Sequence, residues 1–185
     1  PNTRLDAVFL RPDAEIPTYT SIFLAPAEVQ FARNWDPNRG GRSLSRRLDT
    51  ADIVAIKDNL ATMFGDIFRE ELTAGGYQVV TEPGPDTLLV VPAIVDLYIT
   101  APDNMTPGSN RTYTANSGRM TLVLELRDSV TGETLARVVD SRSGRNTGFM
   151  TVTNRVTNTA DARRAIRVWA QALRSGLDSL HKSGA

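Results

Sequence analysis

The chain of 185 residues contains no cysteine. Disulfide bonds, thiolate metal sites and a cysteine nucleophile are therefore excluded within this sequence. Histidine is almost as scarce, because His181 is the only one, and it lies near the C-terminus, where a cation suits the end of a helix. A catalytic triad or a histidine metal site would need that ring to be held by a third group. We therefore expect no catalytic residue, no metal site and no cofactor.

Lysine is also rare, since Lys57 and Lys182 stand against nineteen arginines. This bias is typical of a GC-rich bacterial genome. A selected preference for the guanidinium group would give the same excess of arginine over lysine. The formal net charge is zero, which argues against a nucleic-acid-binding protein held by counterion release. The longest apolar run, Leu88–Val95, is far shorter than the roughly 20 residues of a spanning helix. We expect any membrane attachment to come only from a lipid anchor upstream of Pro1.

The strongest local pattern is a hairpin over residues 117–142. Leucines alternate with other residues over 121–127, the period that places one face of a strand on a core. The segment 128–132 then supplies turn residues, and Gly132 can adopt the positive φ that such a turn needs. Residues 135–141 run back as the second strand.

Two amphipathic helices are predicted by apolar residues at three- and four-residue spacings. The first is capped by Asp49 or Thr50 and ends at the glycine pair 75–76. The second begins near Asn158 or Thr159 and carries its apolar stripe to Leu180. Each helix has one apolar face, so each is expected to cover a sheet.

Further strands are expected at 19–31, 77–81 and 87–100. Pro26 indicates an edge or a bulge in the first of them, because proline cannot donate to a strand ladder. The early part of 87–100 is apolar on both faces, as in a central strand. The order predicts an α+β fold, a mixed sheet of about five strands with two amphipathic helices packed on it.

The chain is long enough for one good hydrophobic core, and 41% of its residues are hydrophobic. We therefore expect an extended N-terminal arm over residues 1–17 and a single α+β domain over residues 18–185. The arm is proline-punctuated and has four apolar residues that could dock it: Leu5, Val8, Phe9 and Leu10.

The segment 33–47 is a candidate binding loop, because it holds five arginines against one aspartate. Guanidinium groups can bind lipid phosphate, an anionic glycan or an acidic partner by bidentate contacts; a merely solvated loop is the alternative. The helix at 49–72 is acidic by contrast, so loop and helix could pair between subunits or within one. The predicted binding arginines are Arg39, Arg42, Arg46 and Arg47.

The segment 101–116 is the longest irregular stretch, and loops of that length are often functional or disordered. Its mix of polar and aromatic residues suits recognition. The predicted binding residues here are Asn110, Arg111 and Tyr113.

The acidic residues give a weaker signal. Asp96 follows an apolar strand and could be a lone buried acid, although a strand-end residue more often faces solvent. Asp128 with Arg127, and Asp140 with Arg142, are expected to serve as turn caps or cross-strand ion pairs rather than as acid–base groups.

Several segments, in this order, resemble an uncharacterised family of bacterial lipoproteins, one of the domain-of-unknown-function classes. The resemblance covers roughly residues 5–145. It is carried by YTSIFLAPAEVQF with Trp35, the helix ending in GGYQVV, EPGPDTLLVVPAIVDLYITAP, YTANSG, RMTLVLELRDSVTGE and LARVVDSR. It implies a periplasmic or outer-membrane-associated protein whose native precursor is anchored through a lipid-modified cysteine, and it implies no reaction.

More distantly, the layout is similar to periplasmic lipoprotein domains that activate cell-wall synthases or build secretion pores. Three functions therefore stay open. The first is a non-enzymatic cell-envelope scaffold that binds a protein or glycan partner. The second is a self-assembling or accessory subunit of an envelope transport, secretion or cell-wall synthesis complex. The third is a carboxylate-dependent hydrolase, which would need two close acids in a pocket.

Overall fold

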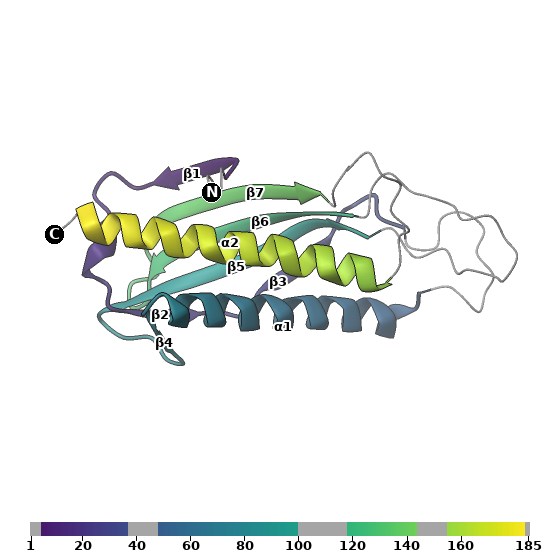
Figure 1. The fold of residues 1–185 in the computed structure, drawn as a ribbon, viewed down its shortest axis with the longest axis horizontal. Helices are drawn as coiled ribbons and strands as arrows, with labels where there is room; N and C mark the ends of the chain where they lie inside the picture. Colours follow the sequence, from purple (N-terminus) through teal and green to yellow (C-terminus); the bar gives the residue numbers. More distant parts are fainter. Residues whose placement is uncertain (1–4, 37–47, 100–117, 144–154, 184–185) are drawn as a thin grey trace, which may run out of the picture.

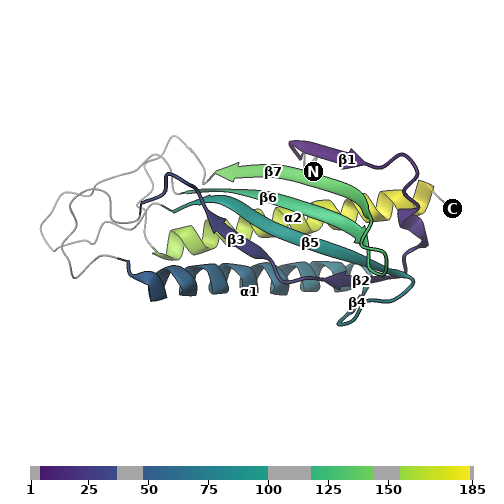
Figure 2. The same cartoon turned by 180° about the vertical axis from the view of Figure 1, so that it is seen from behind.

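The computed structural model describes residues 5–36, 48–99, 118–143 and 155–183. Within these ranges one mixed sheet has both long helices packed on the same face, as Figures 1 and 2 show from opposite sides. The strands are β1 Ala7–Leu10, β2 Ser21–Leu24, β3 Glu28–Phe31, β4 Gln78–Val80, β5 Thr87–Tyr98, β6 Arg119–Asp128 and β7 Thr134–Ser143. The helices are η1 Ile16–Thr18, α1 Thr50–Ala74 and α2 Arg155–Ser183.

The predicted α+β class is confirmed, with more strands than expected. The described part of the sheet has seven strands in the order β1-β7-β6-β5-β2-β4, and β3 also pairs with β5. The expectation of about five strands was too low for two reasons. Pro26 divides the predicted 19–31 strand into β2 and β3, and the N-terminal segment adds β1.

The central position predicted for the 87–100 strand is confirmed. β5 pairs antiparallel with β6 on one side and parallel with β2 and β3 on the other. Pro92 lies between the residue pairs made with β2, which end at Val90, and those made with β3, which begin at Ala93. The proline without an N–H therefore falls where β5 changes its neighbour.

The helix α1 begins and ends as its sequence predicts. The Asp49 carboxylate accepts the Asp52 N–H at 2.8 Å, and the Asp52 carboxylate accepts the Asp49 N–H at 3.1 Å, a complete capping box. The chain leaves the helix through Gly75 and through Gly76, whose φ is 87°. The predicted apolar stripe packs on the sheet through Phe64, Phe68 and other residues that are buried.

The helix α2 begins at Arg155, a little before the predicted start near Asn158 or Thr159. Its predicted apolar stripe is the buried one, with Ile166, Trp169 and Leu177 almost fully enclosed. These side chains meet the inward-facing residues of the hairpin strands in one hydrophobic core. The hairpin turn is also as predicted, because Gly132 has a φ of 74°.

The N-terminal segment is part of the sheet. β1 pairs antiparallel with β7 at one edge, and Ile16 is buried in the core. Leu5 packs against that core, as expected of a docking residue. The docking role expected for Val8, Phe9 and Leu10 was wrong, because these side chains are 58%, 62% and 49% exposed. Backbone pairing to β7 holds this segment in place instead.

Neither helix in the described ranges is long and apolar enough to cross a membrane.

Candidate functional site

The seven binding residues predicted from the sequence lie outside the described residues. Arg39, Arg42, Arg46 and Arg47 fall in 37–47, and Asn110, Arg111 and Tyr113 fall in 100–117. Their binding role stays a prediction. A site built from the described residues must therefore come from elsewhere in the fold.

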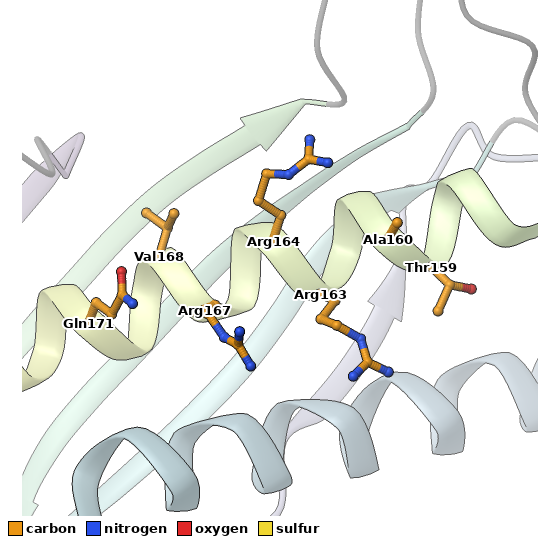
Figure 3. Close-up of a pocket in the computed structure, with 7 residues that line it drawn as sticks. All are labelled: Thr159, Ala160, Arg163, Arg164, Arg167, Val168 and Gln171. Carbon is orange, nitrogen blue, oxygen red and sulfur yellow. The ribbon is translucent and has the colours of Figure 1, made fainter. Parts of the chain in front are cut away.

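The structure has a second concentration of arginine, on the outer surface of α2. A hollow of about 740 Å³ opens along this helix. Figure 3 shows that Arg163 and Arg167 project toward α1 while Arg164 projects to the other side of α2. The lining also includes the uncharged Thr159, Ala160, Val168 and Gln171. We call Arg163, Arg164 and Arg167 the α2 arginine face.

The α2 arginine face is only partly neutralised. Arg164 lies 3.2 Å from the Asp161 carboxylate, one turn earlier on the same helix, and its side chain is 61% exposed. Arg167 lies 3.7 Å from Glu70 and 3.9 Å from Glu71, both on α1. Among the described residues, Arg163 has no ion-pair partner. A planar, always charged guanidinium in this setting can donate two hydrogen bonds to one carboxylate or phosphate group.

The acidic helix α1 pairs with α2 of the same chain. The Glu71 carboxylate accepts a hydrogen bond from Gln171 Nε2 at 3.3 Å and another from Arg174 at 3.2 Å. Its side chain is only 14% exposed. The pairing of the basic loop with the acidic helix, within one subunit or between two, stays a prediction, because 37–47 lies outside the described residues. The α1 acids Glu70 and Glu71 instead contact the α2 arginines Arg167 and Arg174.

The buried acid of the described structure is Asp140. Its side chain is 1% exposed, and its Oδ2 accepts hydrogen bonds from Trp169 Nε1 at 2.6 Å and Arg142 Nε at 2.5 Å. Its Oδ1 accepts the Asp6 N–H at 3.0 Å. The predicted Asp140–Arg142 ion pair is therefore present, but along one strand and not across two. The carboxylate joins β7, α2 and the segment before β1.

Asp96 is exposed, so the alternative of a lone buried acid was wrong for it. Its φ of 51° places it at the irregularity where the β5–β6 register shifts between Val95 and Tyr98. Positive φ at a residue other than glycine is uncommon, and aspartate tolerates it better than most.

Asp128 is a turn cap, as predicted. Its carboxylate accepts the backbone N–H groups of Thr131 at 2.6 Å and Val130 at 2.9 Å, and the Tyr19 hydroxyl at 2.8 Å. The Thr131 bond and then the Tyr19 bond lower the pKa of Asp128 to about 2. Burial, and then the same hydrogen bond, raises the pKa of Tyr19 to about 12. The proton of this hydrogen bond thus stays on the tyrosine, and the contact holds the turn to the chain between η1 and β2.

His181 lies on the last turn of α2 between two backbone carbonyls. Its Nδ1 is 2.8 Å from Leu177 O and its Nε2 is 3.4 Å from Tyr19 O. Its ring is tilted against Tyr77, with centroids 5.8 Å apart, and the Tyr77 hydroxyl donates to Asp178 at 2.7 Å. Burial and the Asp178 hydrogen bond raise the pKa of Tyr77 above its ordinary value. These contacts tie α2 to the chain just before β2 and to the chain after α1.

Over the part of the chain that the structure describes, no three histidine, aspartate or glutamate side chains form a group able to hold a metal ion.

The fold and the site define a class of protein: an α+β domain with a mixed sheet, a helical layer on one face and an arginine-rich outer helix surface. The chain belongs to the DUF3313 family, described as a protein of unknown function, whose match covers residues 2–173. No curated protein matches the chain.

Several solved structures are similar in fold. A DUF330 protein from Xanthomonas campestris is 11% identical, with a TM-score of 0.49 over 96% of this chain and 94% of that one. A minor lipoprotein from Acinetobacter baumannii is 13% identical, with a TM-score of 0.42 over 87% and 92%. The PelC dodecamer subunit from Paraburkholderia phytofirmans is 10% identical, with a TM-score of 0.40 over 89% and 96%. These are likenesses of chain path, and no activity is carried over from them.

Proposed function

We propose that this DUF3313 protein is a non-enzymatic interaction module of the bacterial cell envelope, which binds an acidic protein partner on its α2 arginine face. The observation that supports the proposal is the hollow along α2, whose lining among the described residues includes three arginines and no acid. Asp140, Glu71 and Asp128 already accept hydrogen bonds from Trp169, Arg174 and the Thr131 backbone N–H. These three acids therefore have structural roles. The envelope location is supported by the sequence resemblance to bacterial lipoproteins.

The charge balance of the two helices explains why the α2 arginine face would need an outside partner. Glu71, the least exposed acid on this side of α1, is already shared by Gln171 and Arg174. Arg163 and Arg164 extend beyond that contact, and Arg164 is 61% exposed. An acidic partner surface would complete their coordination, and exposed charges of this kind steer association and set its salt dependence.

The test uses the protein expressed from its own gene in its host and crosslinked in intact cells, with the envelope fraction purified afterwards. We expect R163E/R164E to reduce recovery of the partner about tenfold, corresponding to roughly 1.4 kcal/mol. The difference should shrink at high salt, because salt screens exposed charges. Arg167 is kept in this variant, so its contacts with Glu70 and Glu71 remain.

The matched control is R69E on α1. Arg69 is also an exposed helix arginine with an aspartate three residues before it, 3.4 Å from Asp66. Partner recovery should be unchanged in this control. Equal losses in both variants, or recovery of the wild-type protein in the cytosol, would contradict the proposal.

A further inference from the structure

The edge of the sheet formed by β1 is not covered by any other strand or helix of the described residues. Five large hydrophobic side chains are exposed in the described residues, and three of them are consecutive on this strand: Val8, Phe9 and Leu10. Natural sheet edges usually carry charges, prolines or bulges that block pairing with another chain. The four residues of β1 include none of these. Figures 1 and 2 show no other labelled element outside β1.

The opposite edge is blocked in the usual ways. β4 has only three residues, and Glu82, Pro83 and Pro85 follow it closely. β3, which borders the other part of β5, presents the exposed polar residues Glu28 and Gln30. β1 is also short and is flanked by Asp6, Arg11 and Pro12, but it differs from β3 and β4 in carrying three consecutive exposed apolar side chains. This run makes β1 the stronger candidate for the addition of a further strand.

The backbone groups of β1 alternate between β7 and the outside. The Arg11 N–H donates to Leu135 O at 2.9 Å, and the register places Phe9 opposite Arg137 and Ala7 opposite Val139. Bonded and non-bonded pairs alternate in an antiparallel ladder. Ala7, Phe9 and Arg11 therefore bond to β7, and the N–H and C=O groups of Val8 and Leu10 point away from the sheet.

We propose that β1 pairs antiparallel with β1 of a second copy of this chain, joining two sheets across a two-fold axis at Phe9. In this register Val8 lies opposite Leu10 of the second copy, so the outward N–H and C=O groups of both residues are all satisfied. Phe9 lies opposite its own counterpart. A register centred on Val8 would place Leu10 opposite Asp6, whose N–H already donates to the Asp140 carboxylate.

The chemistry of the strand favours this occupant over a lipid surface. Val8 and Leu10 lie opposite Val138 and Ala136 on the helix side of the sheet, whereas Phe9 lies on the other side. A membrane would cover one of these sides, but an added strand covers both. Antiparallel pairing also brings the Asp6 end of one strand near the Arg11 end of the other, although each charge already has a contact in its own chain, Asp6 with the Ser141 N–H and Arg11 with Glu133. The inference concerns a different surface from the α2 arginine face and does not depend on the proposed function.

The absence of cysteine allows a direct test of the register, with the 185-residue chain as it stands. Non-bonded antiparallel pairs have Cα atoms about 4.5 Å apart, within the range of a disulfide. We expect F9C to form a covalent dimer under mild oxidation, and V8C mixed with L10C to cross-link more than either alone. V130C is the matched control, since Val130 is also an exposed apolar residue, at the hairpin turn, and should stay monomeric.

Sedimentation measures the association without any thiol. The wild-type chain should shift with concentration toward twice its 20.2 kDa mass, and F9E, which opposes two charges across the axis, should remain a monomer. V130E should behave as the wild type. The inference would be overturned if F9C cross-linked no faster than V130C, or if the wild type stayed a monomer at every concentration. It would also be overturned if the wild type formed no dimer but bound lipid vesicles, and F9E abolished that binding. If R163E/R164E dimerises as the wild type does, the β1 pairing does not depend on the α2 arginine face.

Discussion

At the scale of single residues, the buried Asp140 carboxylate is the polar contact on which the most elements depend. It accepts hydrogen bonds from Trp169, Arg142 and the Asp6 backbone N–H. We expect D140N to lower the free energy of unfolding by about 2–4 kcal/mol, because an amide nitrogen cannot accept those hydrogens. Urea denaturation measures the change.

The control for this prediction is D96N. Asp96 is exposed, and asparagine tolerates its positive φ as well as aspartate does. Its unfolding free energy should stay within about 0.5 kcal/mol of the wild type. A similar small change in D140N would show that Asp140 does not anchor the fold.

Asp128 makes a separate prediction about pH. Its pKa is about 2 in the folded protein against 3.8 as a free side chain, so the ionised carboxylate stabilises the fold above about pH 4. That contribution is lost as the pH falls toward 2. We expect the wild type to lose more stability over this interval than D128N, as followed by thermal unfolding at a series of pH values. Parallel curves for the two proteins would contradict the Asp128 contacts.

The two aspartates also show which residue properties a sequence reveals. The role of Asp128 could be predicted because a turn cap depends on its next few neighbours. The burial of Asp140 could not, because its donors come from Asp6 and Trp169, far away in the chain. Asp96 is exposed, as is more usual for an acid after an apolar strand, but the local sequence did not show its positive φ or the register shift at this point.

At the scale of elements, Glu71 joins the two helices. We expect E71A to lower the free energy of unfolding by about 1–2 kcal/mol, because Gln171 and Arg174 lose a common acceptor. E70A is the matched control, since Glu70 is 69% exposed and lies 3.7 Å from Arg167. Its effect should stay below about 0.5 kcal/mol. Equal losses in the two variants would mean that helix propensity, and not the contact between helices, is being measured.

Most elements could be predicted because their signals are local. The Asp49 capping box, the exit through Gly76 and the hairpin turn at Gly132 all depend on a few adjacent residues. The sequence predicted part of the division of the 19–31 strand, because Pro26 indicated an edge or a bulge there but not two separate strands. The strand β1 was not predicted, because its pairing with β7 is set by residues at the other end of the sequence.

At the scale of the whole molecule, the α2 arginine face and the β1 edge belong to different elements, one to a helix and one to the sheet. We expect their variants to separate, so that F9E keeps partner capture in cells and R163E/R164E keeps the self-association of the purified chain. Crosslinking in the host and sedimentation of the purified protein measure the two results. If F9E alone also abolished partner capture, the partner would bind only the paired form.

The candidate site was less predictable than the fold. An excess of arginine over lysine was plain in the sequence, but the α2 arginines looked like the solvated side of an amphipathic helix. Only the packing of α1 against α2 shows that Arg167 and Arg174 have acidic partners within the chain, whereas none of the described residues pairs with Arg163.

The pairing of β1 with β7 also sets an order of folding. Asp6 and Asp140, which join these strands, are 134 positions apart in the chain. Closing so long a loop is slow, so the chain passes through an interval in which β1 has no neighbour. We expect β1 to be among the last strands to join the sheet. Throughout that interval Val8, Phe9 and Leu10 form an apolar segment with both strand edges free, the state in which a chaperone would be of most use to this protein.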